Sequence, residues 1–195
     1  MYKTVVFDLD GTLLNTLTDL ADAGNRLCRK YGWPTHERQA YRYFVGNGIP
    51  KLVERLAPAD QRTPAVLEAA LADFKRDYGQ HLRDTTAPYP GIPCPEMLAT
   101  LKANGVQLAV FSNKADALAK EVVKDYFGTQ YFTIVRGQMT GVAPKPAAEG
   151  TNALLQALHA DPASTLYVGD SNVDVETAHN ANLPCCGAVW GFRTR

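Results

Sequence analysis

Short apolar runs that stop at polar loops, and that alternate with helical patterns, constrain the fold of this chain more than any other feature. The first run, Thr4–Phe7, is β-branched and aromatic and ends at Asp8, as a buried strand does where it meets a loop. Four later runs have the same character, at 106–111, 132–135, 166–168 and 185–190. Helical patterns separate these later runs. The alternation predicts an α/β fold whose core is a Rossmann-like parallel sheet.

The stretch from residue 15 to residue 83 breaks this alternation. Apolar residues from Leu17 to Tyr31 recur at helical spacing and form one continuous stripe. Further helical patterns follow at about 37–44, 49–57 and 64–82, with no strand-like run among them. We therefore predict an all-helical cap at 15–83, inserted directly after the first strand of an α/β core that is formed by 1–14 and 84–195.

The overall charge excludes two classes of partner. The 195 residues include 20 Lys and Arg and 20 Asp and Glu, so the formal net charge is zero. Broad electrostatic binding to nucleic acid or to an anionic membrane requires clustered Lys and Arg, so we expect neither partner. No apolar run approaches the roughly 18 residues of a membrane span, and Asp8 interrupts the N-terminal run before a signal peptide could form. We expect a cytoplasmic protein.

The cysteines carry no pattern that indicates a metal or a disulfide. Cys28, Cys94, Cys185 and Cys186 form no CxxC pair and no zinc-ligand spacing. A chain of this length can bury a sizeable core without such crosslinks. We therefore expect four free thiols.

Two carboxylates follow the first strand, in the segment Asp8-Leu9-Asp10-Gly11-Thr12. Residues two apart in an extended segment point to the same side, and Gly11 permits a tight turn beside them. In open α/β sheets, ligands bind beyond the C-terminal ends of the strands. We therefore place Asp8 and Asp10 at the ligand site. Taken alone, the segment could also be a turn capped by its aspartates.

Complementary groups follow the other predicted strands. Ser112, Asn113 and Lys114 come after 106–111, and Asp170 and Asp174 come after 166–168. Lys145 lies between two prolines. If these ends converge with the first strand, up to four carboxylates meet and repel one another. A divalent cation would offset the repulsion. Hard oxygen ligands favour Mg²⁺, which also takes phosphate oxygens as ligands, so we predict a magnesium site that admits an anionic phosphate.

These motifs, along nearly the whole chain, resemble those of the haloacid dehalogenase superfamily of phosphohydrolases. The four motifs occur in order, as DLDGT at 8–12, FSN at 111–113, the lysine at 145 and GDSNVD at 169–174. The helical insert is similar to that family's cap. Within the superfamily, VGNG at 45–48, PYPG at 88–91 and VWGFRTR at 189–195 look most like phosphoglycolate phosphatases. One departure is KPAAE at 145–149, where the family often has an acidic residue sooner after the lysine.

The resemblance implies catalytic and metal-binding roles for the aspartates. Asp8 would attack phosphorus and form an aspartyl-phosphate. Asp10 would protonate the leaving alkoxide and then deprotonate the hydrolytic water. Asp8, the Asp10 carbonyl and Asp170 would bind Mg²⁺. Asp174 would be an alternative metal ligand or would orient the site, although it could also simply cap a helix.

The resemblance further implies a phosphate-binding group. Ser112, Lys145 and the backbone N–H groups near Leu9 and Asn113 would hold the phosphate oxygens, because phosphoryl transfer depends on positioning and charge stabilisation. Two simpler interpretations stay open. Ser112 and Asn113 could cap the helix that follows, and Lys145 could be a plain exposed lysine.

Substrate selection is expected in the cap, because the core motifs contact only the phosphate. Gly46-Asn47-Gly48 is an amide-rich turn, and Asn47, Gly48 and the nearby Arg42 are candidate specificity residues. Arg42, Lys51 and Arg55 could attract a small carboxylate such as that of phosphoglycolate. An ordinary solvated helix face explains these three cations equally well.

The leading functional hypothesis is therefore an Mg²⁺-dependent phosphatase that acts on a small phosphorylated metabolite, with 2-phosphoglycolate as the first candidate. Another small-molecule phosphatase, or a sugar phosphomutase of the same superfamily, remains an alternative. A regulatory protein that binds a phosphate ligand without turnover is the non-enzyme alternative. Asp10 argues against a dehalogenase, whose leaving group needs no proton, and the complete acidic set favours an enzyme.

Overall fold

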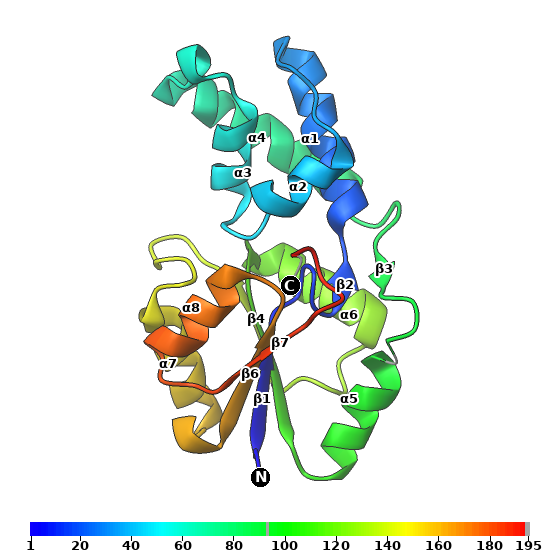
Figure 1. The fold of residues 1–195 in the computed structure, drawn as a ribbon, viewed down its shortest axis with the longest axis vertical. Coiled ribbons are helices and arrows are strands. Elements are labelled where there is room, and N and C mark those ends of the chain that lie inside the picture. The colour runs from blue at the N-terminus through cyan, green and yellow to red at the C-terminus, as the bar shows by residue number, and fades with distance from the viewer. Residues whose placement is uncertain (93, 194–195) are drawn as a thin grey trace. The chain divides into compact units, whose positions relative to one another are not determined.

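The computed structural model describes residues 1–92 and 94–193 and divides the chain into two compact units (Figure 1). The core unit comprises Met1–Asn15 and Pro88–Arg195, and the cap unit comprises Thr16–Ala87. The core unit thus includes Asn15, which we expected in the cap. The cap unit includes 84–87, which we expected in the core. The reason is Asp19, whose carboxylate accepts hydrogen bonds from the backbone N–H groups of Thr85 at 2.8 Å and Thr86 at 2.9 Å.

The core unit is built on a five-stranded parallel sheet with the strand order β5-β4-β1-β6-β7. Its strands are β1 (Thr4–Phe7), β4 (Gln107–Ala115), β5 (Ile134–Gln138), β6 (Thr165–Gly169) and β7 (Cys185–Gly187). In the centre, Val6 of β1 lies beside Ala109 of β4 and Tyr167 of β6. Every residue of β1 is buried, as a central strand covered on both faces requires. The predicted Rossmann-like α/β fold is confirmed.

Four helices cover the sheet: α5 (Cys94–Ala103), α6 (Asp116–Phe127), α7 (Ala148–Leu158) and α8 (Asn172–Asn180). Figure 1 shows α5 and α6 on one face and α7 and α8 on the other. The chain progresses from β1 outward to β4 and β5, and then returns to add β6 and β7 on the opposite side of β1. The strand order therefore reverses between β1 and β6. Ligands bind at such a switch point, beyond the C-terminal ends of the strands.

Several strand ends differ from the predicted ones. β4 continues to Ala115 instead of stopping at 111, with a register irregularity between Phe111 and Ala115. β5 begins at Ile134 rather than 132, and β7 ends at Gly187 rather than 190. A second, two-stranded sheet joins β2 (Leu14–Asn15) to β3 (Ala87–Pro88), the segments where the chain passes between the units. The sequence pattern did not predict this ladder.

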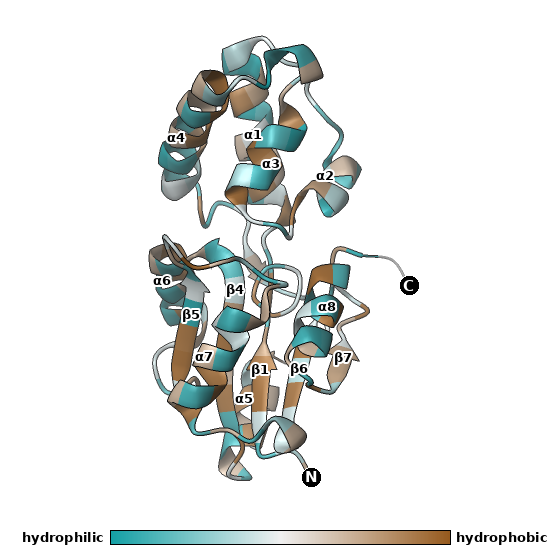
Figure 2. Ribbon diagram, turned by 90° about the vertical axis from the view of Figure 1, so that its left-hand side faces the viewer, coloured by the Kyte–Doolittle hydropathy of each residue, from teal (hydrophilic) through white to brown (hydrophobic). Residues whose placement is uncertain are grey.

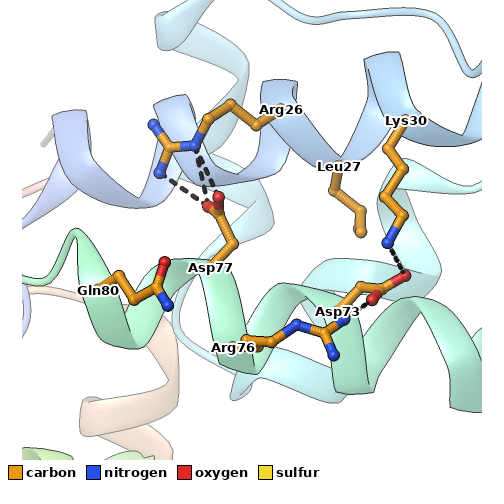
Figure 3. A pocket seen from close by; sticks show the side chains of 7 residues that line it. All are labelled: Arg26, Leu27, Lys30, Asp73, Arg76, Asp77 and Gln80. Atoms are coloured by element: carbon orange, nitrogen blue, oxygen red, sulfur yellow. Dashed lines mark hydrogen bonds and ion pairs between the residues drawn. The ribbon is translucent and has the colours of Figure 1, made fainter.

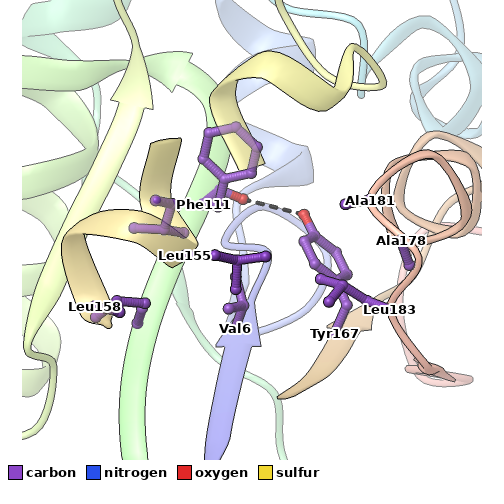
Figure 4. Close-up of a cluster of buried hydrophobic side chains, with 10 residues drawn as sticks. Val6, Phe111, Leu155, Leu158, Tyr167, Ala178, Ala181 and Leu183 are labelled. Carbon is purple, nitrogen blue, oxygen red and sulfur yellow. Dashed lines mark hydrogen bonds between the residues drawn. The ribbon is translucent and has the colours of Figure 1, made fainter. Parts of the chain in front are cut away.

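An apolar cluster supports the sheet beneath α7 and α8 (Figure 4). Its fully or largely buried members are Val6, Ala109, Phe111, Leu154, Leu155, Leu158, Tyr167, Ala178, Ala181 and Leu183. Tyr167 brings one polar atom to this cluster, and its hydroxyl donates to the carbonyl oxygen of Phe111 at 3.4 Å. Burying a hydroxyl is costly unless it is hydrogen-bonded, so the position of this ring is tightly specified.

The cap unit is all helical. Its helices are α1 (Leu17–Tyr31), α2 (Arg38–Phe44), α3 (Ile49–Leu56) and α4 (Pro64–Gln80), with a 3₁₀ turn at Ala59–Gln61. Their ends lie within two residues of the predicted 17–31, 37–44, 49–57 and 64–82. Figure 2 shows polar and apolar residues alternating along α4, as one buried stripe requires. Tyr41, Phe74 and Tyr78 are fully buried inside the unit.

The cysteines are free thiols, as expected. Cys28 and Cys94 are buried, whereas Cys185 and Cys186 are exposed on β7. Among the described residues, no helix combines the length and the apolar content that crossing a membrane would require.

Gly24 of α1 allows the close approach of Tyr41. A Cβ atom at Gly24 would lie 2.5 Å from the Tyr41 ring, which is fully buried. We expect Gly24→Ala to lower the free energy of unfolding by about 1–3 kcal/mol, because the ring must shift inside a packed unit. Urea denaturation followed by circular dichroism measures the change.

The matched control is Gly79→Ala near the end of α4, where no atom lies within 4 Å of the added Cβ. Alanine should leave the stability unchanged or raise it by up to about 1 kcal/mol, because it costs less backbone entropy than glycine in a helix. Equal effects of the two substitutions would contradict the steric explanation.

Candidate active site

Lys145 is at the centre of a buried polar network in the core unit. Its Nζ atom lies 2.8 Å from Asp8 Oδ1 and 2.8 Å from Asp174 Oδ1. It also donates to the carbonyl oxygen of Phe111 at 3.2 Å and to the hydroxyl of Tyr167 at 3.0 Å. Only 2% of the Lys145 side chain is exposed, so the interpretation as a plain exposed lysine is wrong. A desolvated ammonium of this kind requires acceptors on several sides.

Asn113 holds the backbone of Lys145 in place. The Asn113 Oδ1 atom accepts from the Lys145 N–H at 2.8 Å, and Nδ2 donates to the Lys145 carbonyl oxygen at 3.1 Å. The side chain therefore positions the lysine, and a phosphate contact by Asn113 would come from its backbone N–H. Ser112 is buried beside it, and its Oγ atom accepts from the N–H of Lys114 at 3.2 Å.

The alternative that Ser112 and Asn113 cap the following helix is wrong. β4 runs through both residues, and α6 begins only at Asp116, with Ala115 in the capping position and no side-chain cap. The signal that sequence reasoning missed is the continuation of the strand. It carries Lys114 to the end of the sheet as well.

Asp174 performs two structural tasks at once. At the start of α8 its Oδ2 atom accepts from the N–H of Ser171 at 3.0 Å and from the Ser171 hydroxyl at 2.6 Å, which completes a capping box. Its Oδ1 atom faces Lys145. Burial opposes ionisation, but Lys145 and the Ser171 donors outweigh it and hold the pKa of Asp174 below its ordinary value. The capping interpretation and the site interpretation are therefore compatible.

Asp8 follows β1 directly and shares Lys145 with Asp174. Burial, followed by the negative charges of Asp174 and Asp170, raises the pKa of Asp8 to about 8 against the opposing effect of Lys145. One ammonium thus cannot keep both neighbouring carboxylates ionised. A further positive charge at this point would restore the ionised form of Asp8.

Asp170 follows β6 and is held by the segment after β7. The Phe192 N–H donates to Asp170 Oδ2 at 2.7 Å, and the Thr12 hydroxyl donates to Oδ1 at 3.4 Å. The Trp190 indole N–H donates to the carbonyl oxygen of Thr12 at 2.9 Å, which ties the same segment to the loop after β1. Burial raises the pKa of Asp170 to about 6, although the Phe192 N–H acts in the opposite direction.

No local sequence pattern predicted that Trp190 and Phe192 hold the loop at Thr12 and the carboxylate of Asp170 in place. The only indication was the family-like segment 189–195. Residues 194 and 195 of that segment lie outside the described residues. Contacts between Phe192 and Asp170 depend on where the chain leaves β7, which local patterns do not specify.

Three aspartates of the site could hold a metal ion. Asp8, Asp170 and Asp174 each offer a carboxylate oxygen, and these atoms all lie within 4.8 Å of one another. Gly11, with φ of 97°, packs so closely that a Cβ atom would lie 2.5 Å from the Asp170 carboxylate oxygens. A set of hard oxygen donors in a tightly packed pocket fits a divalent cation. The Asp10 side chain is not in this group, and its carbonyl stays a predicted ligand.

Asp10 forms a second ion pair with Lys114. The Lys114 Nζ atom lies 3.2 Å from Asp10 Oδ1, and 2% of the Lys114 side chain and 14% of the Asp10 side chain are exposed. The sequence placed Lys114 among the groups that follow the strand predicted at 106–111 without a role of its own, and it gave no indication for Tyr167. The site therefore contains two separate ammonium groups, one beside Asp8 and one beside Asp10.

The candidate specificity residues lie in the cap unit. Arg55 donates to the carbonyl oxygens of Tyr43 at 3.2 Å and Phe44 at 2.7 Å, and to the Asn47 amide oxygen at 2.9 Å. Lys51 is paired with Glu54 at 2.7 Å. Arg55 therefore stabilises the end of α2 and the turn at Asn47, and the expectation that Arg55 and Lys51 attract a substrate carboxylate finds no support in these contacts.

The roles of Arg42, Asn47 and Gly48 in substrate selection stay predictions. Arg42, Asn47 and Gly48 are each partly exposed. Gly48 has φ of 82° and immediately precedes α3. Any part that they play in substrate selection would be a contribution of the cap unit.

A pocket of about 210 Å³ lies between α1 and α4 of the cap unit (Figure 3). Its lining consists of Arg26, Leu27, Lys30, Asp73, Arg76, Asp77 and Gln80. The charges there pair with one another, since Arg26 binds Asp77 at 2.8 Å and Asp73 contacts both Lys30 and Arg76. The pairs Arg26–Asp77 and Lys30–Asp73 join the two helices, whereas Arg76 pairs with Asp73 within α4.

Known proteins are similar to this chain in both sequence and fold. The family model for haloacid dehalogenase-like hydrolases matches residues 5–188. A phosphoglycolate phosphatase of Thiobacillus denitrificans is 31% identical over 193 residues, which cover 97% of this chain and 84% of the relative. One of Neisseria meningitidis is 32% identical, over 97% of this chain and 81% of the relative. A crystal structure of a candidate phosphoglycolate phosphatase from Lactobacillus delbrueckii subsp. bulgaricus superposes with a TM-score of 0.91 at 28% identity, over 99% of this chain and 88% of that chain.

Gly191 permits the close packing of the segment after β7 on Asp170. A Cβ atom at Gly191 would lie 2.2 Å from Asp170 Cβ. We expect Gly191→Ala to displace Asp170 and to weaken Mg²⁺ binding by about tenfold or more, because residues that orient a metal ligand affect affinity on that scale. Isothermal titration calorimetry measures the affinity. Gly187→Ala is the control, since no atom lies within 4 Å of its added Cβ, and an equal loss in both variants would contradict the prediction.

Metal binding should depend on pH in a defined direction. With its pKa raised to about 6, Asp170 holds a proton at pH 5 and has lost it at pH 7. A proton and a metal ion compete for the same carboxylate, so the apparent affinity for Mg²⁺ should fall at least about tenfold from pH 7 to pH 5. Calorimetric titrations at the two pH values test this. Equal affinities would contradict either the raised pKa of Asp170 or its role as a ligand.

Proposed function

We propose that this chain, which belongs to the haloacid dehalogenase-like hydrolases and is a phosphatase of that family, hydrolyses 2-phosphoglycolate. This substrate is a small phosphorylated metabolite, and the proposed cofactor is Mg²⁺. The observation that carries the proposal is the pairing of Lys145 with Asp8 and Asp174 at 2.8 Å each, next to the carboxylate of Asp170. The proposed nucleophile, a buried cation and carboxylates that could bind a metal ion thus lie at one end of the sheet.

Asp8 is the proposed nucleophile. One of its carboxylate oxygens attacks phosphorus, the bond from phosphorus to the ester oxygen breaks, and an aspartyl-phosphate forms. Attack requires the ionised carboxylate, whereas burial favours the protonated one. Bound Mg²⁺ would supply the positive charge that keeps Asp8 ionised and would neutralise charge on the phosphate; Asp8, Asp170 and the Asp10 carbonyl would hold it, with Asp174 as the alternative ligand.

Asp10 is the proposed general acid and base. It gives a proton to the leaving alkoxide in the first step and takes one from the hydrolytic water in the second, when water attacks phosphorus and releases inorganic phosphate from Asp8. Asp10 pairs with Lys114 rather than with Lys145, which supports a role apart from that of the nucleophile.

Lys145 and Ser112 are the proposed phosphate-binding side chains. Both are buried, and Asn113 fixes the backbone of Lys145 by two hydrogen bonds. A preorganised cation in a desolvated site stabilises developing negative charge far better than one in water. The backbone N–H of Asn113 would add a neutral donor to this group.

The choice of 2-phosphoglycolate is supported by the relatives. The two quoted phosphoglycolate phosphatases, at 31% and 32% identity, align with 97% of this chain. We also propose that Arg42, Asn47 and Gly48 of the cap unit take part in selecting this substrate.

The test of the proposed function is the release of inorganic phosphate from a panel of small esters in the presence of Mg²⁺. Wild-type protein should prefer 2-phosphoglycolate, and Asp8→Asn should reduce kcat by at least about a thousandfold, because it removes the nucleophile. Asp125→Asn changes an aspartate of α6 outside the proposed site and is the control for the substitution itself. Equal release by wild type and Asp8→Asn would refute the assignment of the nucleophile.

A further inference from the structure

We propose that Lys114 is a specificity-determining residue that binds a carboxylate on the leaving group of the substrate. The proposal rests on the proposed function and assigns to the core unit a recognition task that the sequence alone suggested for the cap. Its basis is the position of a buried ammonium beside Asp10 rather than beside the phosphate-binding groups.

Lys114 is rigidly placed. It is the penultimate residue of β4, directly before Ala115, which pairs with Gln138 of β5. A Cβ atom at Gly137 would lie 2.4 Å from the Lys114 carbonyl oxygen, so the two strands touch closely at this point. The Lys114 N–H is also bonded to Ser112. A charged side chain on a fixed strand end can discriminate among substrates, because little entropy is lost when it binds.

The ammonium groups of Lys145 and Lys114 lie beside different carboxylates, which the proposed function places at the phosphorus and at the ester oxygen of the scissile bond. Lys145 contacts Asp8 and is therefore on the side of the nucleophile and the phosphate. Lys114 lies 3.2 Å from Asp10, the group that must contact the ester oxygen. A general acid acts within about 2.6–3.2 Å of its target, so with Asp10 Oδ1 as the acid atom the ester oxygen would lie within about 6.4 Å of the Lys114 ammonium.

The chemistry of glycolate matches this position. Its carboxylate is joined to the ester oxygen through a single CH₂ group, so the carboxylate reaches the space around Asp10 once the ester oxygen is in place. Lys114 is 2% exposed, and an ammonium in such surroundings binds an anion more strongly than one in water. An ester without the carboxylate would make no such contact with the ammonium. A site that binds a polar group discriminates in this way against an analogue that lacks it.

The experiment compares 2-phosphoglycolate with ethyl phosphate, which lacks the carboxylate. In Lys114→Met, kcat/KM for 2-phosphoglycolate should fall at least about tenfold further than kcat/KM for ethyl phosphate. Lys114→Arg should recover part of that ratio, because it keeps the charge. Lys120→Met is the matched control, since this lysine of α6 is exposed and paired with Asp116, and its ratio should equal that of the wild type.

A binding measurement makes the test independent of turnover. Calorimetry with 3-phosphonopropionate, the non-hydrolysable analogue that keeps the carboxylate, and with propylphosphonate should show that Lys114→Met weakens only the former, by about tenfold or more. The loss of its partner could leave Asp10 with an unpaired charge that destabilises the variant. Comparing Asp10→Asn/Lys114→Met with Asp10→Asn removes that charge from both proteins.

Two results would overturn the proposal. Equal losses for the ester or analogue with the carboxylate and for the one without it would mean that Lys114 only positions Asp10. A wild type that binds the two phosphonates equally would mean that no carboxylate site exists. If no ester is hydrolysed, the proposed function fails, and the phosphonate comparison still decides the role of Lys114.

Discussion

The sharing of one buried ammonium by two carboxylates is the interaction on which the rest of the site depends. Lys145 is almost fully buried, and its charge is tolerable only because Asp8 and Asp174 lie 2.8 Å away on different segments. The surrounding groups keep these three in place. Asn113 holds the lysine backbone, and the capping box of Ser171 orients Asp174. A buried ion network of this kind is useful only when every member is satisfied.

The network also explains why the site calls for a cation. Lys145 offsets the charge of Asp174, which leaves Asp8 and Asp170 with pKa values raised to about 8 and about 6 by burial. Protons or a metal ion can offset that excess of negative charge, and only the metal leaves the Asp8 carboxylate ionised. The same burial that raises the cost of the charges would strengthen their interaction with phosphate.

The two units differ in how they use charge. In the cap unit, contacts among Arg26, Lys30, Asp73 and Asp77 join α1 to α4, and Arg55 closes the end of α2. These cations stabilise the helices. In the core unit, the buried cations lie at the ends of strands, beside the candidate nucleophile and the candidate general acid. We infer that recognition of the leaving group begins in the core unit.

Local sequence patterns determined the alternating fold, the helical cap and the position of Asp8 after β1, because spacing and strand ends are properties of neighbouring residues. Only the tertiary structure decided which distant groups meet. The hydroxyl of Tyr167, which the strand pattern treats as apolar, reaches Lys145, and the backbone of Phe192 reaches Asp170. Lys114 meets Asp10 because β4 lies beside β1 and continues past its predicted end. Such contacts depend on strand order and register, which no local pattern specifies.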